Sequence, residues 1–514
     1  MSIKTFAAIN VGSYELSMKI FEISPKSGMH QIDHIRHRID LGTDTYATGK
    51  ISYERVDELC DILREFTVIM QGYKVDDYKA NGTSAIRETE NTTIVLDQIR
   101  IRTGIKIEVL SNSEQRFLDY KSIASKGEVF NKIIENSTAI VDIGGGSIQI
   151  SLFDKDSLVT TQNIRLGILR LKESLAKLNP TRTQIEPLVE EMVNNHLSIF
   201  KKLYLKERTV ENLIVVDDYV SFVLQKKISG ISKTGCVDRN FYMEMEKKLW
   251  SLNVEELVRE FDMEEENIYL LYLSAILVKR LVEVMDAKQV WAPGVTLCDG
   301  IAYHYAQKNK WLISDHDFEK DIIACAQNIS KRYMGSRRRS ATLESIALNI
   351  FDSMRKVHGL SKRERLLLQI STLLHDCGKY ISLSTVGECS HSIIMATEII
   401  GLSHLEREIV ANVVKYNHLD FAYFDEIGRE STIDKQSYLI IAKLTAILRV
   451  ANGLDRSHKE KFVDIKISLK ERELVITVDT DVDITLEKGL FGSKADFFEE
   501  VYSIRPVIKL KRQL

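Results

Sequence analysis

Apolar and polar residues alternate in two stretches that share one arrangement, a strand, a glycine-containing turn and a second strand. The first covers residues 5–23, with its turn at Gly12. The second covers residues 138–153, with its turn at Gly144. A period of two is typical of β-strands, and glycine allows the positive φ and close approach that a turn over a phosphate requires. The repeat predicts a duplicated domain.

Around these stretches, apolar residues recur at helical spacing in some segments and in short strand-like runs in others. Helices are expected at 52–71, 184–204, 242–262 and 265–285, a strand followed by a loop at 78–87, and strands at 212–216 and 289–291. Helices and strands that alternate along a chain are typical of mixed α/β folds. The pattern therefore predicts α/β organisation as far as residue 305.

The pattern changes in the C-terminal part of the chain. Over residues 317–453 leucine and isoleucine recur every three or four positions, which predicts a group of helices. Residues 463–479 then alternate like a β-hairpin, and two short segments follow at 495–502 and 504–510. The sequence thus predicts four domains, an α/β lobe at 1–127, a second lobe at 128–310, a helical domain at 311–460 and a small β-containing domain at 461–514.

Composition narrows the classes of function. The 514 residues are 44% hydrophobic and 28% charged, and 70 basic against 73 acidic residues leave a net charge of −3. The charge balance disfavours a nucleic-acid partner, and the presence of only 5 prolines and no Ser-, Gly- or Gln-rich tract excludes a disordered scaffold. Apolar runs such as 270–278 are far shorter than the roughly 20 residues of a membrane span, and the six cysteines form no C-x-x-C pair. We therefore expect a cytoplasmic protein with reduced thiols and no membrane partner.

The sharpest chemical motif follows the apolar strand at 138–143. Asp142 precedes three consecutive glycines, Gly144–Gly146, and then Ser147. Consecutive glycines expose amide N–H groups to an anion, a serine hydroxyl adds a donor, and a carboxylate beside them can hold Mg²⁺ against phosphate oxygens. The alternative is a tight hairpin that needs glycine only for its geometry. The matching turn at Gly12 favours the phosphate loop.

With these turns in place, the chain resembles the exopolyphosphatase / guanosine pentaphosphate phosphatase family of the sugar kinase–Hsp70–actin superfamily, over nearly its full length. The matching segments are Asn10–Glu15 for the first phosphate loop, Gly82–Arg87 for Gly-Thr-x-x-x-Arg, Ser111–Phe117 for Ser-Gly-x-Glu-Glu-Ala-Arg, Asp142–Ser147 for the second loop and Gly167–Leu171 after it. The resemblance implies two actin-like (ribonuclease H-like) α/β lobes around a cleft, then an all-α HD-like domain and a small C-terminal segment.

The resemblance also implies an activity. Family members release terminal phosphate from polyphosphate or from guanosine pentaphosphate (pppGpp) with Mg²⁺, and homodimers are common among them. Carried over by position, the phosphate-binding residues are Gly12, Ser13, Thr83, Arg87, Gly144, Gly145, Gly146 and Ser147, the metal ligand is Asp142, and the catalytic residues are Arg87, Glu114 and Gln115. We therefore expect a phosphoanhydride hydrolase that acts on polyphosphate or a guanosine nucleotide.

Four segments of the expected cleft depart from the family pattern. Gln115 replaces the carboxylate that activates water, and an amide cannot accept a proton near neutral pH. Asn10 replaces the carboxylate of the first loop, and Asp299 replaces a glutamate. Asp217 and Asp218 fall where the family has a glycine-rich loop, and their charges would repel an anion. The alternative function is therefore a degenerate family member that binds phosphate or nucleotide and regulates a partner without turnover.

Two of the candidate residues keep a structural alternative. Glu114 is the obvious substitute for the missing base, but neighbours on a helix point about 100° apart, so a role in the first helical turn is the favoured alternative. Arg87 suits the bidentate grip of a terminal phosphate. Its alternative is an ion pair with Glu90 or Glu114.

The helical domain carries an HD signature, the adjacent pair His375 and Asp376. In metal-dependent phosphohydrolases this pair ligates a metal together with an upstream His and a downstream Asp, and these positions fall on Arg339 and Asn452. An arginine there replaces a neutral donor with a cation, so we do not expect a working metal site. The basic run at 331–339 is either a solvated helix end or a track for a polyanion, and both interpretations stay open.

Overall fold

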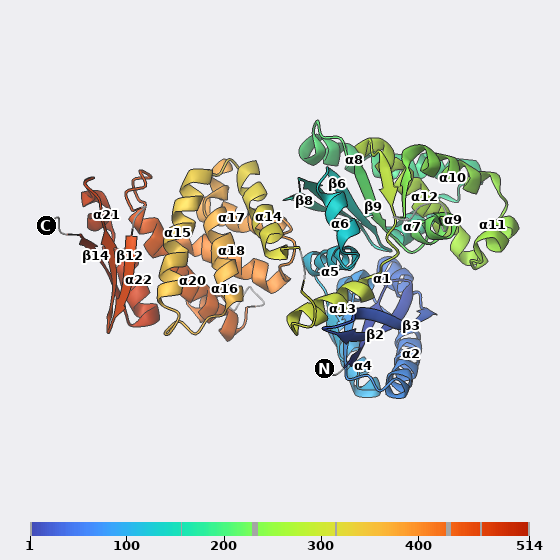
Figure 1. The fold of residues 1–514 in the computed structure, drawn as a ribbon, viewed down its shortest axis with the longest axis horizontal. Coiled ribbons are helices and arrows are strands. Elements are labelled where there is room, and N and C mark those ends of the chain that lie inside the picture. The colour runs from blue at the N-terminus through green and yellow to red at the C-terminus, as the bar shows by residue number, and fades with distance from the viewer. Residues whose placement is uncertain are drawn as a thin grey trace. The chain divides into compact units, whose positions relative to one another are not determined.

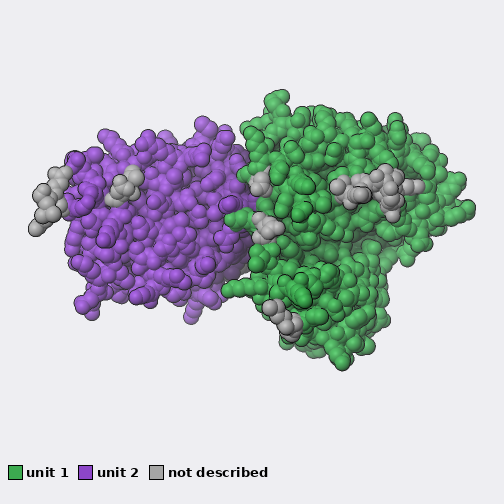
Figure 2. Space-filling view, viewed as in Figure 1, with its two compact units in different colours: residues 1–318 green, residues 319–514 purple. Residues whose placement is uncertain are grey.

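The computed structural model describes residues 3–155, 157–228, 235–313, 316–427, 433–462 and 465–511. The chain divides into two compact units, residues 1–318 and 319–514, which Figure 2 colours separately. Figure 1 shows two sheets flanked by helices in the first unit, and helices followed by a small sheet in the second. The predicted change from mixed α/β to helical organisation is thus present.

The first sheet of unit 1 has five strands in the order β3-β2-β1-β4-β5. Its central strand β1 pairs antiparallel with β2 and parallel with β4. Alternate side chains of β1 enter two cores, since Ala7, Ile9 and Val11 pack on one face of the sheet and Phe6 and Ala8 on the other. The elements are β1 (Lys4–Val11), β2 (Glu15–Ser24), β3 (Gly28–Arg38), α1 (Leu41–Thr48), α2 (Tyr53–Gly72), β4 (Asp77–Gly82), α3 (Ser84–Glu88), α4 (Thr92–Thr103), β5 (Ile107–Val109) and α5 (Asn112–Ala124).

The second sheet repeats this arrangement, with six strands in the order β10-β11-β9-β6-β7-β8. Its central strand β6 is antiparallel to β7 and parallel to β9. Asn10 pairs with Ser17 in the first sheet and Asp142 with Gln149 in the second, so Asn10 and Asp142 hold equivalent positions just before the two glycine turns. The elements are α6 (Glu128–Ile134), β6 (Thr138–Ile143), β7 (Ile148–Asp154), β8 (Ser157–Ile164), α7 (Ile168–Leu178), α8 (Arg182–Phe200), the π-helical turn η1 (Lys201–Leu205), β9 (Asn212–Val216), α9 (Val220–Ile228), β10 (Cys236–Asp238), α10 (Arg239–Ser251), α11 (Val254–Phe261), α12 (Glu265–Met285) and β11 (Gln289–Trp291).

One expected helix, at 242–262, forms two helices. The side chain of Asn253 accepts the N–H of Glu256 (2.9 Å), and the Glu256 carboxylate accepts the N–H of Asn253 (2.8 Å). This capping box ends the continuity of the helical pattern and starts α11.

Helix α13 (Leu297–Lys308) follows the last strand of the second sheet but packs on the first sheet. Its Leu297 and Ile301 share a core with Phe6 of β1 and Leu118 of α5. The chain therefore returns to the first lobe before it leaves unit 1.

Unit 2 is helical up to residue 454 and ends in a three-stranded sheet of order β12-β13-β14. Strands β12 and β13 pair antiparallel as the predicted hairpin, and the last strand, β14, runs parallel to β13 as the third strand of the sheet. Residues 463 and 464, the start of the predicted hairpin, lie outside the described residues. The elements are α14 (Phe318–Arg332), α15 (Arg337–Ser353), α16 (Lys362–Leu374), the 3-10 turn η2 (Cys377–Tyr380), α17 (Val386–Ala396), α18 (His404–His418), α19 (Phe424–Ile427), α20 (Lys435–Leu454), β12 (Ile465–Lys470), β13 (Glu473–Val478), α21 (Thr485–Leu490), α22 (Gly492–Tyr502) and β14 (Arg505–Leu510).

One helix among the described residues, α20, is long and apolar enough to cross a membrane, and 72% of its most apolar window is buried inside the protein. The helix packs against α15, α18 and α22. Core helices have the same composition, so packing within unit 2 accounts for the apolar side chains of α20.

Candidate active site

A cavity of about 380 Å³ lies between the two lobes of unit 1, where the turns after β1 and β6 face each other. A Cβ atom added to Gly145 would lie only 3.1 Å from the Cβ of Ser13, which shows how closely the two turns approach. Of the residues singled out from the sequence, the cavity is lined by Gly12, Ser13, Thr83, Gln115, Asp142, Gly144 and Gly145. Arg87, Glu114, Gly146 and Ser147 are described by the structure but do not border it.

In the second glycine turn, Gly144–Ser147, the backbone N–H groups point away from α7. The carbonyl oxygens of Gly144 and Gly145 accept the first two N–H groups of α7 (3.1 and 3.0 Å), and that of Gly146 accepts the Nε–H of Arg170 (2.8 Å). In a trans peptide the next N–H points opposite to the carbonyl, so three successive N–H groups face the other way. Gly167 allows this contact, since a Cβ there would lie 2.4 Å from the turn's backbone. The geometry is that of an anion-binding turn.

A network of hydroxyl groups joins the first turn to the rest of its lobe. Ser13 Oγ lies 2.9 Å from both Tyr46 OH and Ser84 Oγ, and Tyr46 donates to Ser84 over 3.0 Å. Burial raises the pKa of Tyr46, so its phenol keeps its proton. A Cβ on Gly146 would lie 2.4 Å from the Tyr46 oxygen, so the second turn also touches this network. Neither Tyr46 nor Ser84 is identified by the sequence.

Carboxylates cluster at the other side of the cavity. Burial, and then the charge of Asp218, raises the pKa of Asp142 to about 7. The same two causes raise the pKa of Glu15 to about 7, although Glu15 is paired with Arg36 at 2.7 Å. Burial, and then the charge of Asp142, raises the pKa of Asp119 well above its usual value. This cluster concentrates negative charge next to an anion-binding turn.

Asp217 differs from its neighbour Asp218. Its Oδ1 accepts the N–H groups of Tyr219 (2.9 Å) and Ser221 (3.1 Å), and its Oδ2 accepts the hydroxyl of Ser274 (2.5 Å). These bonds make Asp217 a structural carboxylate at the start of α9, although burial raises its pKa to about 6. Asp218 therefore carries most of the repulsion that the sequence attributes to the pair.

The carboxylate cluster fits a divalent cation. Asp142 Oδ2, Asp119 Oδ2 and Asn10 Oδ1 are buried and have no hydrogen-bond partner among the described residues. The described part of the chain holds no preformed group of three or more His, Cys, Asp or Glu side chains around a metal position. Mg²⁺ is commonly held by one or two carboxylates together with water and substrate phosphates, so two carboxylates and an amide oxygen suffice here.

Of the three predicted catalytic residues Gln115 alone lines the cavity, and Arg87 and Glu114 lie behind it in other contacts. Arg87 Nη1 donates to the carbonyl of Leu110 (2.7 Å) and to Gln115 Oε1 (3.4 Å). The carboxylate of Glu114 accepts the N–H of Ser111 (3.0 Å), and Ser111 Oγ accepts the N–H of Glu114 (3.2 Å). Glu114 thus forms the capping box of α5, the alternative that helix geometry favours.

Comparison with known proteins decides the family. The Ppx/GppA phosphatase family matches residues 19–309, and its domain III matches residues 323–492. The chain belongs to the Ppx/GppA phosphatase family.

Relatives and solved structures agree with this assignment. The chain is 19% identical over 485 residues to a guanosine-5'-triphosphate,3'-diphosphate pyrophosphatase of Photobacterium profundum, and this match covers 92% of this chain and 91% of that enzyme. It is 25% identical over 186 residues to exopolyphosphatase 1 of Mycobacterium tuberculosis, a match to 35% of this chain and 52% of that enzyme. An exopolyphosphatase structure from Cytophaga hutchinsonii superposes with a TM-score of 0.52 at 19% identity, covering 59% of this chain and 98% of the other. The predicted fold class, two actin-like lobes followed by a helical domain, is confirmed.

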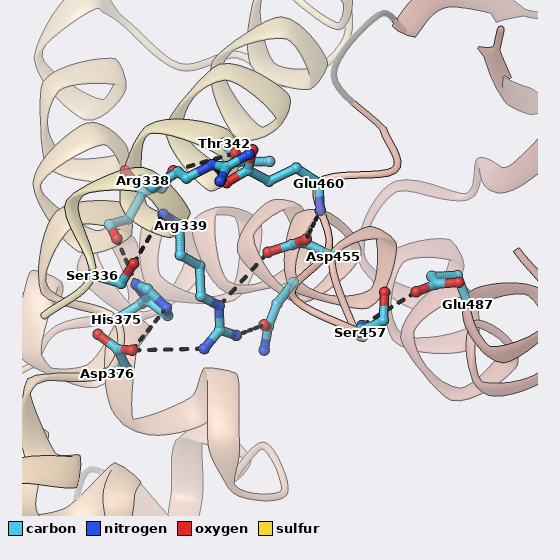
Figure 3. Close-up of polar contacts among 12 residues, drawn as sticks. Ser336, Arg338, Arg339, Thr342, His375, Asp376, Asp455, Ser457, Glu460 and Glu487 are labelled. Carbon is cyan, nitrogen blue, oxygen red and sulfur yellow. Dashed lines mark hydrogen bonds and ion pairs between the residues drawn. The ribbon is translucent and has the colours of Figure 1, made fainter. Parts of the chain in front are cut away.

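In domain III the guanidinium of Arg339 lies between Asp376, which belongs to the HD signature, and Asp455 (Figure 3). The guanidinium of Arg339 donates to Asn452 Oδ1 (2.9 Å) and lies 3.6 Å from Asp376 and 3.7 Å from Asp455. Burial lowers the pKa of His375 to about 4, which keeps the imidazole neutral. A positive guanidinium between two carboxylates stands where a divalent cation would stand, so these residues do not fit a metal ion.

The basic run of this Ppx/GppA protein divides between two helices. Lys331 and Arg332 end α14, and Arg337–Arg339 begin α15. The Arg338 side chain is 84% exposed, whereas Arg339 is buried. A polyanion can therefore contact Arg338, but it cannot use the charge of Arg339.

Compared with that of Asp142→Asn, the unfolding temperature of the wild type should fall by a few degrees as the pH rises from about 5 to 8 in EDTA. The carboxyl pKa values of about 7 for Asp142 and Glu15 lie above those of the unfolded chain. Each of these two carboxyl groups therefore binds more protons in the folded than in the unfolded state in this interval, and the stability it contributes is lost as the pH rises through 7. Burial lowers the pKa of histidines such as His34 and His375, and their contribution has the opposite sign. Thermal melts across this pH range measure the effect.

The control is Asp142→Asn, whose amide carries no charge at any of these pH values. Its unfolding temperature should lack the decline with pH that Asp142 causes, and the histidines contribute equally to both proteins, so that they cancel in the comparison. Mg²⁺ should stabilise the wild type most at pH 8, where the carboxylates are ionised. Equal slopes for the two proteins would contradict the raised pKa of Asp142.

Proposed function

We propose that the cleft of unit 1 is the active site of a phosphoanhydride hydrolase that releases terminal phosphate from polyphosphate or pppGpp. The observation that carries this proposal is that Gly12, Ser13 and Thr83 of one lobe border the same cavity as Asp142 and Gly144 of the other. The chain belongs to a phosphatase family, and its relatives are named for both kinds of substrate.

Each part of the cleft has a task in this proposal. The amide groups of Gly144–Ser147 and the hydroxyls of Ser13 and Thr83 bind phosphate oxygens, and Arg87 holds the terminal phosphate from the side of α5. A divalent cation held by Asp142 would supply positive charge to the phosphate oxygens. The carboxylate of Glu114 already accepts a hydrogen bond in the capping box of α5. Gln115 is therefore the residue at the position where the family carries the carboxylate that activates water.

The alternative function is a binding protein that regulates a partner without turnover. Two features favour it, Gln115 and Asn10, both of which border the cavity where carboxylates are expected. Electrostatic positioning alone can still support catalysis, so the substitutions lower the expected rate and leave binding intact. Turnover separates the two functions, because a regulator binds the same ligand without releasing phosphate.

The test is phosphate release from tripolyphosphate and from pppGpp with Mg²⁺, alongside calorimetric binding of tripolyphosphate. We expect saturable binding and slow release, and Gly145→Val and Arg87→Ala should each weaken binding at least tenfold. A side chain at Gly145 would meet Leu169 and Ser13, at 3.0 and 3.1 Å from its Cβ, and would close the space between the turns. Equal binding by the wild type and both variants would contradict the assignment of this cleft.

Two further expectations accompany the proposed function. All six cysteines are free thiols, as in a reducing compartment, and we place the activity in the cytoplasm. A homodimer is the assembly expected from the family, and sedimentation of the full chain tests it.

A further inference from the structure

Asp119 lies on the same face of α5 as Gln115. The two residues are four positions apart, close to one turn of 3.6 residues, and both border the cavity. Glu114 instead accepts the N–H of Ser111 at the start of the helix. A carboxylate therefore faces the cleft one helical turn beyond the position where the family carries its catalytic glutamate.

The surroundings of Asp119 contain an unsatisfied carboxylate pair. Asp119 is 4% exposed and interacts directly with Asp142. Each has a buried Oδ2 atom that accepts no hydrogen bond among the described residues. The nearby Arg116 donates to Gln149 (3.2 Å) and to the hydroxyl of Thr161, and its charge acts to lower the pKa of both carboxyl groups. One guanidinium carries one positive charge, so it offsets only part of the repulsion between the two carboxylates. Two buried carboxylates need a cation or a shared proton to offset their repulsion.

We propose that Asp119 and Asp142 together hold the divalent cation of this cleft, so that Asp119 supplies the negative charge which Gln115 and Asn10 no longer supply. The cation takes the open Oδ2 atoms of both side chains, and water and substrate phosphate complete its shell. The inference rests on the proposed function for the identity of the site. It concerns metal binding, which is measured without any turnover.

The sequence explains how this arrangement arises. Asn10 and Asp142 occupy equivalent ladder positions in the two sheets, and the first of these has lost its charge. Gln115 has lost the charge expected on α5. Asp119 places a carboxylate on the face of α5 that also carries Gln115, one turn further along the helix and next to Asp142. The cation position therefore keeps two negative charges, which come from Asp119 and Asp142.

The experiment is a titration of the full chain with Mn²⁺ at pH 8 without substrate, in which free Mn²⁺ is measured by electron paramagnetic resonance. The wild type should bind Mn²⁺ in the cleft, and Asp119→Asn and Asp142→Asn should each weaken this binding at least tenfold. The matched control is Asp154→Asn, the same change at a side chain that is 42% exposed, at the end of β7 and outside the cavity. Asp154→Asn should bind Mn²⁺ as the wild type does.

Thermal melts distinguish a lost ligand from a damaged fold. Removal of one of two buried like charges should raise the unfolding temperature of Asp119→Asn in EDTA at pH 8, whereas Mn²⁺ should stabilise only the wild type. If Asp119→Asn does not fold, the smaller Asp119→Ser replaces it in both measurements. Wild-type affinity for Mn²⁺ in either folded variant, or no Mn²⁺ binding by the wild type, would overturn the proposal.

A failure of the proposed function gives a different result. Mn²⁺ binding that depends on Asp119, together with no phosphate release from any tested substrate, supports the cation site and contradicts the hydrolase. Phosphate release with Mn²⁺ binding that is independent of Asp119 supports the hydrolase and contradicts the cation site.

Discussion

Gln115→Glu should raise the rate of terminal phosphate release by roughly 10²–10⁴-fold, the usual contribution of a general base. Gln115 borders the cavity, and its Oε1 lies 3.4 Å from Arg87 Nη1. A carboxylate at this place would lie beside a guanidinium, which keeps it ionised at neutral pH and ready to accept a proton. The measurement is phosphate released from tripolyphosphate with Mg²⁺. Adding Asn10→Asp restores a second charge and should raise the rate further.

Glu114→Gln tests the competing assignment of the base. A glutamine can also serve in a capping box, so this change should alter the free energy of unfolding by less than about 0.5 kcal/mol. Brisk phosphate release by the wild type that Glu114→Gln abolishes would make Glu114 the base. Brisk release that is indifferent to changes at both Glu114 and Gln115 would mean that this segment of α5 is wrongly aligned with the family.

The local features of the cleft can be read from the sequence. The two glycine turns predict equivalent hairpins, and the structure places Gly12 and Gly144 around one cavity. The capping box of α5 is also readable, because Ser111 and Glu114 have the spacing Ser-x-x-Glu. Each of these features depends on residues that are close in the sequence, where backbone geometry alone fixes the relation between side chains.

The features that sequence analysis misses depend on contacts between distant segments. Tyr46 reaches Ser13 and Ser84 only because α1 and α3 pack together beneath the first turn, and a lone tyrosine carries no signal of that contact. Asp119 is different, because its spacing of four from Gln115 on an expected helix places both on one face. The sequence pattern does not predict that Asp119 lies next to Asp142 across the cleft. This contact is what makes Asp119 one member of a buried pair of carboxylates.

Arg339→Ala should lower the free energy of unfolding of unit 2 by about 3–5 kcal/mol, since it leaves buried charges without their partner. The side chains of Arg339, Asp376 and Asp455 are 10%, 8% and 2% exposed. These side chains are largely withdrawn from water although they line a pocket, so water replaces the guanidinium only in part. Arg338→Ala, at the neighbouring side chain that is 84% exposed, should cost no more than about 1 kcal/mol. Urea unfolding of the full chain measures both variants.

A second set of variants separates lost charge balance from lost packing in this cluster. Arg339→Met keeps most of the buried aliphatic volume but leaves Asp455 without its ion pair and Asp376 with only that to Lys379 (3.3 Å), so it should destabilise nearly as much as Arg339→Ala. Adding Asp376→Asn and Asp455→Asn to Arg339→Met removes the remaining charges, and replacement of a whole buried ion cluster is often close to neutral. The triple variant should therefore recover most of the lost stability. If it is as unstable as Arg339→Met alone, the hydrogen bond from Arg339 to Asn452, and not the charge, is what holds α15 against α20.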